Sequence, residues 1–209
     1  DSFVITARPG WGVRRICSFE TKDFIHFTKP ELAIQCDSID EPLIETYGMP
    51  SFSYKGWYIG LLWIYHTLSE NRTKYMGGTM DCQLAYSLNG LHWQRSLRYP
   101  FIPNGKDGSP TSGMVFPSAV RLENGQIIIY ASATPHEHGY FIEDGACIVS
   151  YSLREDGFIC LKAGDEPGSI FTRQMLLNSG NFSINIKCTD GHATCAVYDM
   201  YSNPIEGFG

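Results

Sequence analysis

The chain has 209 residues, of which 43% are hydrophobic and 18% are charged, so it can bury a core and is not disordered. Its net charge is -6 and it has no block of Lys or Arg, which argues against a nucleic acid partner. The longest apolar run, residues 57–65, is too short to span a bilayer, so no membrane attachment is expected. The 12 Tyr, 12 Phe and 21 Gly favour strands and turns over helices.

Strands are predicted in chain order from residue 16 onward. Residues 16–27, ICSFETKDFIHF, indicate one strand followed by a turn. Residues 49–66 follow with two apolar strands joined at Lys55-Gly56. Residues 82–93, CQLAYSLNGLHW, predict a third strand, a tight turn at Asn89-Gly90 and a short fourth strand.

The same order of elements then recurs. Residues 116–132 repeat the Pro-Ser, strand, Gly turn and strand, and residues 147–158 repeat the third strand with a turn at Asp156-Gly157. Residues 16–27 match the second half of such a unit. Four antiparallel strands repeated at this period are typical of β-propeller blades, so the chain is predicted to be all-β with a partial five-bladed propeller. The alternative is a β-sandwich whose repeats are coincidental.

The pattern changes after residue 171. Apolar and polar residues alternate around Asp190-Gly191, which predicts the first hairpin of an appended β-sandwich. The expected domains are therefore 1–170, the propeller blades, and 171–209, the beginning of the second domain. Too few blades are present to close a ring, so further sequence is expected on both sides.

Cysteines and histidines give no metal pattern. The seven cysteines are scattered without a C-x-x-C pair, so no zinc site and no cofactor are predicted, and most of them read as small core residues. The sequence indicates neither a cellular compartment nor an oligomeric state.

Several strings together resemble a known superfamily. They are YGMP at 47–50, YIGLLWIYH at 58–66, QLAYSLNGLHW at 83–93, REDGFICLKAG at 154–164 and YDMYSNPIEGF at 198–208. The chain thus resembles the five-bladed propellers of the glycoside hydrolase family 32/43/68-like superfamily, which includes invertases, levansucrases and arabinanases. The resemblance implies a carbohydrate substrate, a funnel at the propeller axis, and carboxylates from the inner strands that line this funnel.

Carboxylates suit this chemistry because glycoside cleavage needs one acid to protonate the leaving oxygen and a second carboxylate to attack or activate water. The candidates are Glu45 before the first inner strand, Asp81 at the start of a third strand, Asp107 in a Gly-rich loop, and Glu137 after a second strand. The family's Asp before the inner-strand Pro is replaced here by Met49 and by Phe116.

Histidines and aromatic residues are candidates for substrate binding. His66 ends one second strand, and His136 and His138 follow the equivalent strand of the next unit, where an imidazole can bond a sugar hydroxyl. Tyr47 and Trp63 can stack on a sugar ring. Trp93 is instead expected to pack between blades.

Three functions are compatible with these sequence features. The first is a glycosidase that acts on oligo- or polysaccharides, with Glu45 and either Asp81 or Asp107 as the carboxylate pair. The second is a carbohydrate-binding or structural propeller without chemistry, which the missing Asp-Pro pairs favour. A protein-interaction propeller is a weaker third, because the units lack Trp-Asp endings and kelch glycine pairs.

Overall fold

The computed structural model describes residues 2–9, 13–68, 77–140, 144–176 and 183–208. Throughout these residues the regular secondary structure is β, which confirms the all-β prediction, and no helix long and apolar enough to cross a membrane occurs among them. The chain divides into two compact units, Asp1–Glu155 and Asp156–Gly209.

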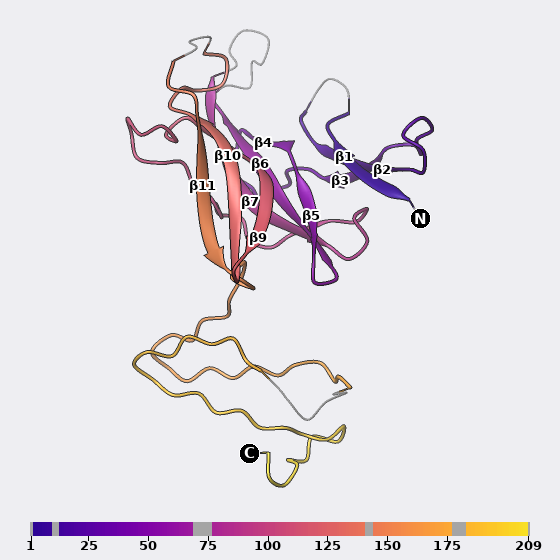
Figure 1. Ribbon diagram of the computed structural model, residues 1–209, viewed down its shortest axis with the longest axis vertical. Helices are drawn as coiled ribbons and strands as arrows, with labels where there is room; N and C mark the ends of the chain where they lie inside the picture. Colours follow the sequence, from indigo (N-terminus) through magenta and orange to yellow (C-terminus); the bar gives the residue numbers. More distant parts are fainter. Residues whose placement is uncertain (1, 10–12, 69–76, 141–143, 177–182, 209) are drawn as a thin grey trace. The chain divides into compact units, whose positions relative to one another are not determined.

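The first unit begins with a small antiparallel sheet (Figure 1). Its strands are β1 (Phe3–Ala7), β2 (Ile16–Thr21) and β3 (Glu31–Ile34), in the order β1-β2-β3. The sequence pattern predicted β2 but assigned no strand to residues 3–7.

The large sheet starts with a group of antiparallel strands that match the first predicted repeat. Strand β6 lies between an edge strand broken into β4 and β5 on one side and β7 on the other, and β7 also pairs with the short β8. The bounds are β4 (Ile44–Gly48), β5 (Ser51–Tyr54), β6 (Trp57–Thr67), β7 (Gly78–Ser87) and β8 (Gln94–Arg95).

The second group matches the second repeat and extends the same sheet. It contains β9 (Met114–Glu123), β10 (Gln126–Thr134) and β11 (Cys147–Arg154), which pair antiparallel with one another in the order β9-β10-β11. A parallel pairing of Met80 with Met114 joins β7 to β9. The sheet order is β11-β10-β9-β7-β6-β4.

Both repeats use the same hairpin turn. Lys55 and Gly56 have φ values of 47° and 84°, and Asn124 and Gly125 have φ values of 51° and 75°. Two consecutive left-handed residues define a type I′ turn, whose twist matches that of the paired strands. The predicted glycine turns are therefore confirmed.

A second shared turn follows β2 and β7. The hydroxyl oxygens of Thr21 and Ser87 accept hydrogen bonds from the backbone N–H groups two and three residues later. Asp23 and Asn89 do the same with their side-chain oxygens. Such side-chain mimicry of backbone turns explains why both copies place Ser or Thr two residues before Asp or Asn.

Two predicted elements are not formed in the described residues. Asp156 has a φ of 60°, but no fourth strand follows it in the described residues. In the described part of the second unit the hairpin around Asp190-Gly191 is not formed, and the only strand-like pairing there is the bridge between Tyr198 and Pro204. An isolated hairpin is marginal in water without a further sheet to cover it, so alternation alone does not produce strands.

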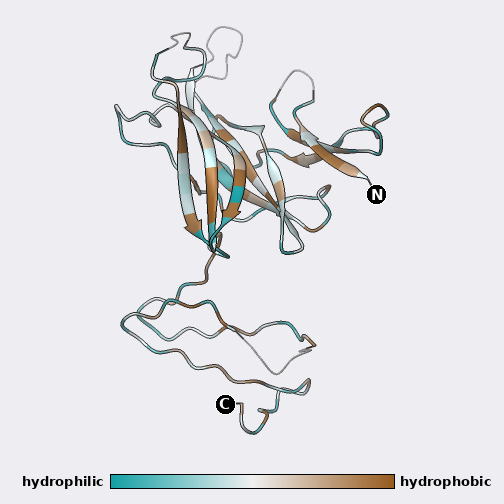
Figure 2. Ribbon diagram, in the orientation of Figure 1, coloured by the Kyte–Doolittle hydropathy of each residue, from teal (hydrophilic) through white to brown (hydrophobic). Residues whose placement is uncertain are grey.

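The described strands form two open sheets, and no closed propeller ring is present among them. The core of the first unit lies where the small sheet packs on the large one. Apolar residues concentrate on the strands (Figure 2), and one buried cluster joins both sheets. Its members are Ile16, Ile34, Met49, Leu62, Ile64, Ala85 and Trp93. Trp93 thus packs between repeats, as its sequence position suggested.

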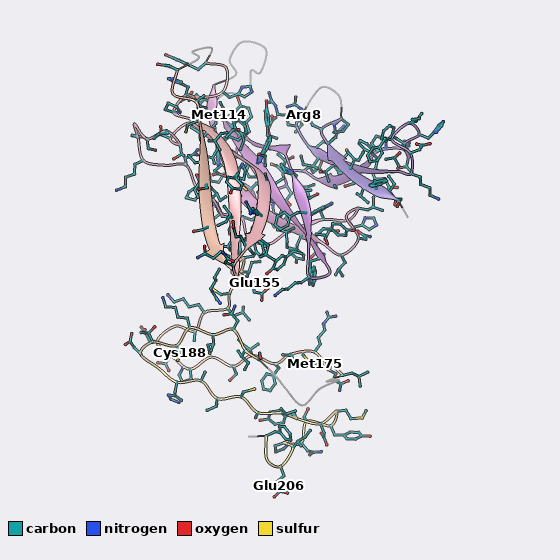
Figure 3. The ribbon with its side chains drawn as sticks, in the orientation of Figure 1. Arg8, Met114, Glu155, Met175, Cys188 and Glu206 are labelled. Carbon is teal, nitrogen blue, oxygen red and sulfur yellow. The ribbon has the colours of Figure 1, made fainter. Side chains whose placement is uncertain are left out.

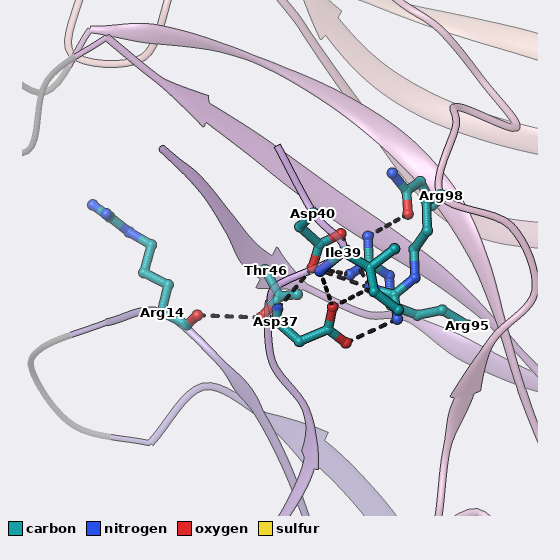
Figure 4. Close-up of polar contacts among 8 residues, drawn as sticks. Arg14, Asp37, Ile39, Asp40, Thr46, Arg95 and Arg98 are labelled. Atoms are coloured by element: carbon teal, nitrogen blue, oxygen red, sulfur yellow. Dashed lines mark hydrogen bonds and ion pairs between the residues drawn. The ribbon is translucent and has the colours of Figure 1, made fainter. Parts of the chain in front are cut away.

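A buried ionic cluster fixes the loop that leads into β4 (Figure 4). The Arg95 guanidinium bonds the Asp40 carboxylate at 2.6 Å and the side-chain oxygen of Gln83 at 2.6 Å. Arg98 joins Asp37 and Asp40 at 2.9 and 3.0 Å. Burial alone would raise the pKa of Asp40. The pKa is nevertheless lowered, because Asp40 accepts hydrogen bonds from Arg95 and from the Asp37 backbone and lies next to the positive charges of the arginines.

Candidate functional site

The candidate site is built on β4, the edge strand of the first repeat. The pairing of β4 with β6 places Glu45 opposite Tyr65 and Thr46 opposite Ile64, and the register then shifts at Tyr47. Such a β-bulge changes the direction in which the strand's side chains point. Glu45 and Tyr47 consequently share the face of the sheet that carries Tyr65.

Arg14 reaches Glu45 from the segment between β1 and β2. Its guanidinium lies 2.5 Å from the Glu45 carboxylate, which is fully buried. Its backbone oxygen accepts a hydrogen bond from the Thr46 hydroxyl (Figure 4), which anchors this segment along the edge of β4. A buried carboxylate next to an arginine is therefore the centre of the site.

Three rings adjoin this ion pair. The Tyr47 hydroxyl lies 3.0 Å from Nε2 of His138, and the rings of Tyr47 and Tyr65 meet edge to face at 5.8 Å. His138 also lies 5.0 Å from the Tyr65 ring, and its backbone N–H bonds the Gly78 oxygen. We call Tyr47, Tyr65 and His138 the aromatic cluster. The loop after β10 thus contributes a histidine to a site on the preceding repeat.

Two arginines cover the cluster. Arg14 lies 4.9 Å from the centroid of the Tyr65 ring and 5.5 Å from that of Tyr47, and Arg8 lies 5.0 Å from the Tyr47 ring. Guanidinium groups at these distances are attracted by the ring faces. Sequence reasoning missed both arginines, because they lie in a segment without strand periodicity and only the fold brings them to β4.

A second carboxylate influences the same ring. Burial raises the pKa of Tyr65, the positive charge of Arg14 opposes that shift, and the negative charges of Glu45 and Glu137 add to it. Glu137 is half-buried in the loop that carries His138. Glu45 and Glu137 therefore act electrostatically on one phenol, although they come from different repeats.

His66 and Asp81 form a separate pair. Nε2 of His66 lies 2.8 Å from the Asp81 carboxylate, and this hydrogen bond raises the pKa of His66 against the opposing effect of burial. Asp81 pairs with Ile64 and Glu45 with Tyr65, so Asp81 and Glu45 lie on opposite faces of the sheet. The two carboxylates are not brought together.

The remaining predicted residues lie outside the aromatic cluster. His136 bonds Asp144 at 2.8 Å and stacks on Tyr140, and Asp107 is exposed in its loop. Trp63 donates its indole N–H to the Pro117 oxygen at 2.9 Å and contacts Phe116, so it packs between β6 and β9. A Cβ on Gly48 would lie 2.6 Å from the Trp63 ring, which explains the glycine there.

Metal-ligand groups are not assembled in the part of the chain that the structure describes: no three His, Cys, Asp or Glu side chains there converge as ligands. Cys17 and Cys82 are buried, and burial raises the pKa of the Cys82 thiol well above its usual value. These two are small core residues, but Cys160, Cys188 and Cys195 are exposed, so the prediction that most of the cysteines lie in the core is wrong.

Comparison with known proteins finds no matching protein family and no matching curated protein. One similar solved structure is that of an N-acetylgalactosamine deacetylase from F. plautii in complex with blood group B trisaccharide. It is 13% identical in sequence to this chain, with a TM-score of 0.46, and the match covers 64% of this chain and 37% of the deacetylase. A glycoside hydrolase is 12% identical with a TM-score of 0.45, and the match covers 78% of this chain and 43% of the hydrolase.

A third similar structure, a complex of BT0996 with RGII, is 13% identical with a TM-score of 0.45, and the match covers 77% of this chain and 42% of that protein. This chain therefore spans less than half the length of each of the three structures. TM-scores below 0.5 do not establish a shared fold.

Proposed function

We propose that this chain belongs to a carbohydrate-active protein, binds an oligosaccharide at the aromatic cluster and hydrolyses a glycosidic bond there. The observation that carries the proposal is the buried Glu45–Arg14 ion pair next to a group of aromatic rings, with Glu137 adjacent to His138 in the loop after β10. Hydrolysis of a glycoside requires a pair of carboxylates, and tyrosine and histidine supply ring faces and hydroxyl or N–H groups that suit a sugar.

The two carboxylates have different surroundings, which is what their two tasks require. Glu137 is half-buried on a loop and is the proposed general acid that protonates the leaving oxygen. Glu45 is buried against Arg14 and is the proposed charged carboxylate that stabilises the positive charge of the transition state or activates its attacker. Asp81 and Asp107 are not part of this proposal.

The fold proposal follows the same repeats. The two strand groups are proposed to be blades of a β-propeller, within residues 1–170, with 171–209 beginning a β-sandwich. The shared type I′ hairpins and the shared side-chain turns after β2 and β7 support repetition of one unit. In such a propeller, β4 and β9 are the inner strands, which accounts for the position of the site at the edge of the first group.

A second candidate is a carbohydrate-binding protein without chemistry. The complete burial of Glu45 against Arg14 favours this alternative, because a carboxylate held in an ion pair can serve only to position the arginine and the rings. Binding without cleavage distinguishes this function from hydrolysis.

The test is a panel of neutral and acidic oligosaccharides, read for thermal shift and for released sugar. We expect at least one oligosaccharide to raise the melting temperature of the wild-type chain and to be cleaved. Tyr47→Ala is expected to weaken binding by about tenfold or more, because it removes a ring at the centre of the contact. Tyr99→Ala, an exposed tyrosine outside the cluster, is the matched control.

Thermal shift without released sugar would favour the binding alternative. Neither a shift nor released sugar with any member of the panel would contradict both functions.

A further inference from the structure

The aromatic cluster carries an arginine that the proposed chemistry does not use. Arg8 follows β1 and is exposed, at the end of the first unit where β9 begins at Met114 (Figure 3). Its guanidinium lies over the Tyr47 ring, 5.0 Å from the centroid. A cation on a ring face is held in place while its N–H groups stay available to a ligand.

Only one of the two arginines at the cluster contacts an acidic side chain of the described residues. Arg14 is matched by Glu45 at 2.5 Å. Arg8 has no ion pair or hydrogen bond among the residues that the structure describes, although the chain as a whole carries a net charge of -6. Arg8 therefore adds a positive charge next to the Tyr47 ring that no acidic side chain of the described residues contacts.

We infer that the bound sugar carries a carboxylate, so that the substrate is an acidic oligosaccharide containing uronic acid. This inference rests on the proposed sugar site and adds its substrate class. The planar guanidinium of Arg8 can bind a carboxylate through two parallel N–H···O bonds, a geometry that a neutral hydroxyl group cannot match. Tyr47 then contacts both the sugar and the arginine that binds the sugar's carboxylate.

The test compares acidic oligosaccharides with their own methyl esters, which keep the sugar and remove the charge. Oligogalacturonate, oligomannuronate and oligoglucuronate, each with its ester, are titrated into the full chain by calorimetry. At least one acid is expected to bind about tenfold to a hundredfold more tightly than its ester, as a charge-assisted hydrogen-bonded pair predicts. This difference should shrink as salt concentration rises, because Arg8 is exposed.

Variants identify the residue responsible. Arg8→Gln is expected to remove most of the difference in affinity between the acid and its ester. Arg8→Lys should restore only part of it, because an ammonium group lacks the planar fork. Arg121→Gln is the matched control, since this exposed arginine lies on β9, where its salt-bridge partner is Glu123.

The outcomes separate the two levels of the proposal. Equal binding of acid and ester, or binding only of neutral oligosaccharides, would overturn the uronic acid inference and leave the sugar site intact. A preference for the acid that persists in Arg8→Gln would also overturn it. Binding of no oligosaccharide at all would contradict the proposed function itself.

Discussion

Replacing Asp40 by alanine is expected to lower the free energy of unfolding by about 3–5 kcal/mol. The side chains of Asp40 and Arg95 are 2% and 3% exposed, so the substitution leaves a buried guanidinium without its carboxylate. Chemical denaturation at pH 7, followed by tryptophan fluorescence, measures the loss. The effect is large because this ionic cluster joins the segment before β4 to β8.

The same ion pair predicts how stability depends on pH. The pKa of Asp40 is lowered in the folded protein, so its contribution is present above the unfolded value of about 4 and is lost as pH falls through the folded value. Between pH 5 and pH 3, the free energy of unfolding should therefore fall more for the wild-type chain than for Asp40→Ala. Both proteins are compared at the same concentration. Asp107→Ala, which removes an exposed carboxylate, is the control.

A loss below about 1 kcal/mol for Asp40→Ala at pH 7 would place the Asp40–Arg95 pair among weak surface salt bridges and contradict the first prediction.

Glu137→Gln is expected to lower the rate of glycoside cleavage by about a hundredfold to ten-thousandfold, because it removes the proton donor to the leaving oxygen. The fold should be unaffected, since Glu137 is half-buried in a loop.

Glu45→Gln should also lower the rate of cleavage. It should in addition lower the free energy of unfolding by about 3 kcal/mol, because Arg14 loses its charged partner. Released sugar and denaturation curves, measured on both variants, separate the two effects.

The matched control for these carboxylates is Glu123→Gln, an exposed residue at the end of β9. It should cleave and unfold as the wild type does. Cleavage by Glu137→Gln at the wild-type rate would rule out this glutamate as the acid. If Glu45→Gln is stable and cleaves at the wild-type rate, Glu45 has no catalytic role and serves only to position Arg14.

Much of the first unit follows from its sequence. The apolar strands and the turns at Lys55-Gly56 and Asn124-Gly125 are local features, because a pair of residues that tolerates positive φ between alternating strands has few other structures available. Glu45, Tyr47 and His138 were also predicted as site residues; in the structure Tyr47 contacts His138, Glu45 lies on the same strand as Tyr47, and Glu137 lies in the loop that carries His138. Repetition made this possible, since equivalent positions of successive units lie at the same end of the strands.

The rest depends on contacts that no local pattern encodes. The bulge at Tyr47 shifts the register, and the register places Asp81 on the face opposite Glu45. Arg14 lies 31 residues before the glutamate that it binds. Residues 183–208 alternate like strands, yet no second sheet covers them, so their alternation produces no ladder within the described part.

The most direct test of the account is to follow the ring signals of His138 and Tyr47 by nuclear magnetic resonance while an oligosaccharide that raises the melting temperature is titrated in. If the aromatic cluster binds the sugar, the signals of these two rings and of Tyr65 shift in proportion to binding, whereas the signal of His92, which lies in the turn after β7, does not. Shifts confined to residues outside the aromatic cluster, at saturating sugar, would contradict the placement of the site.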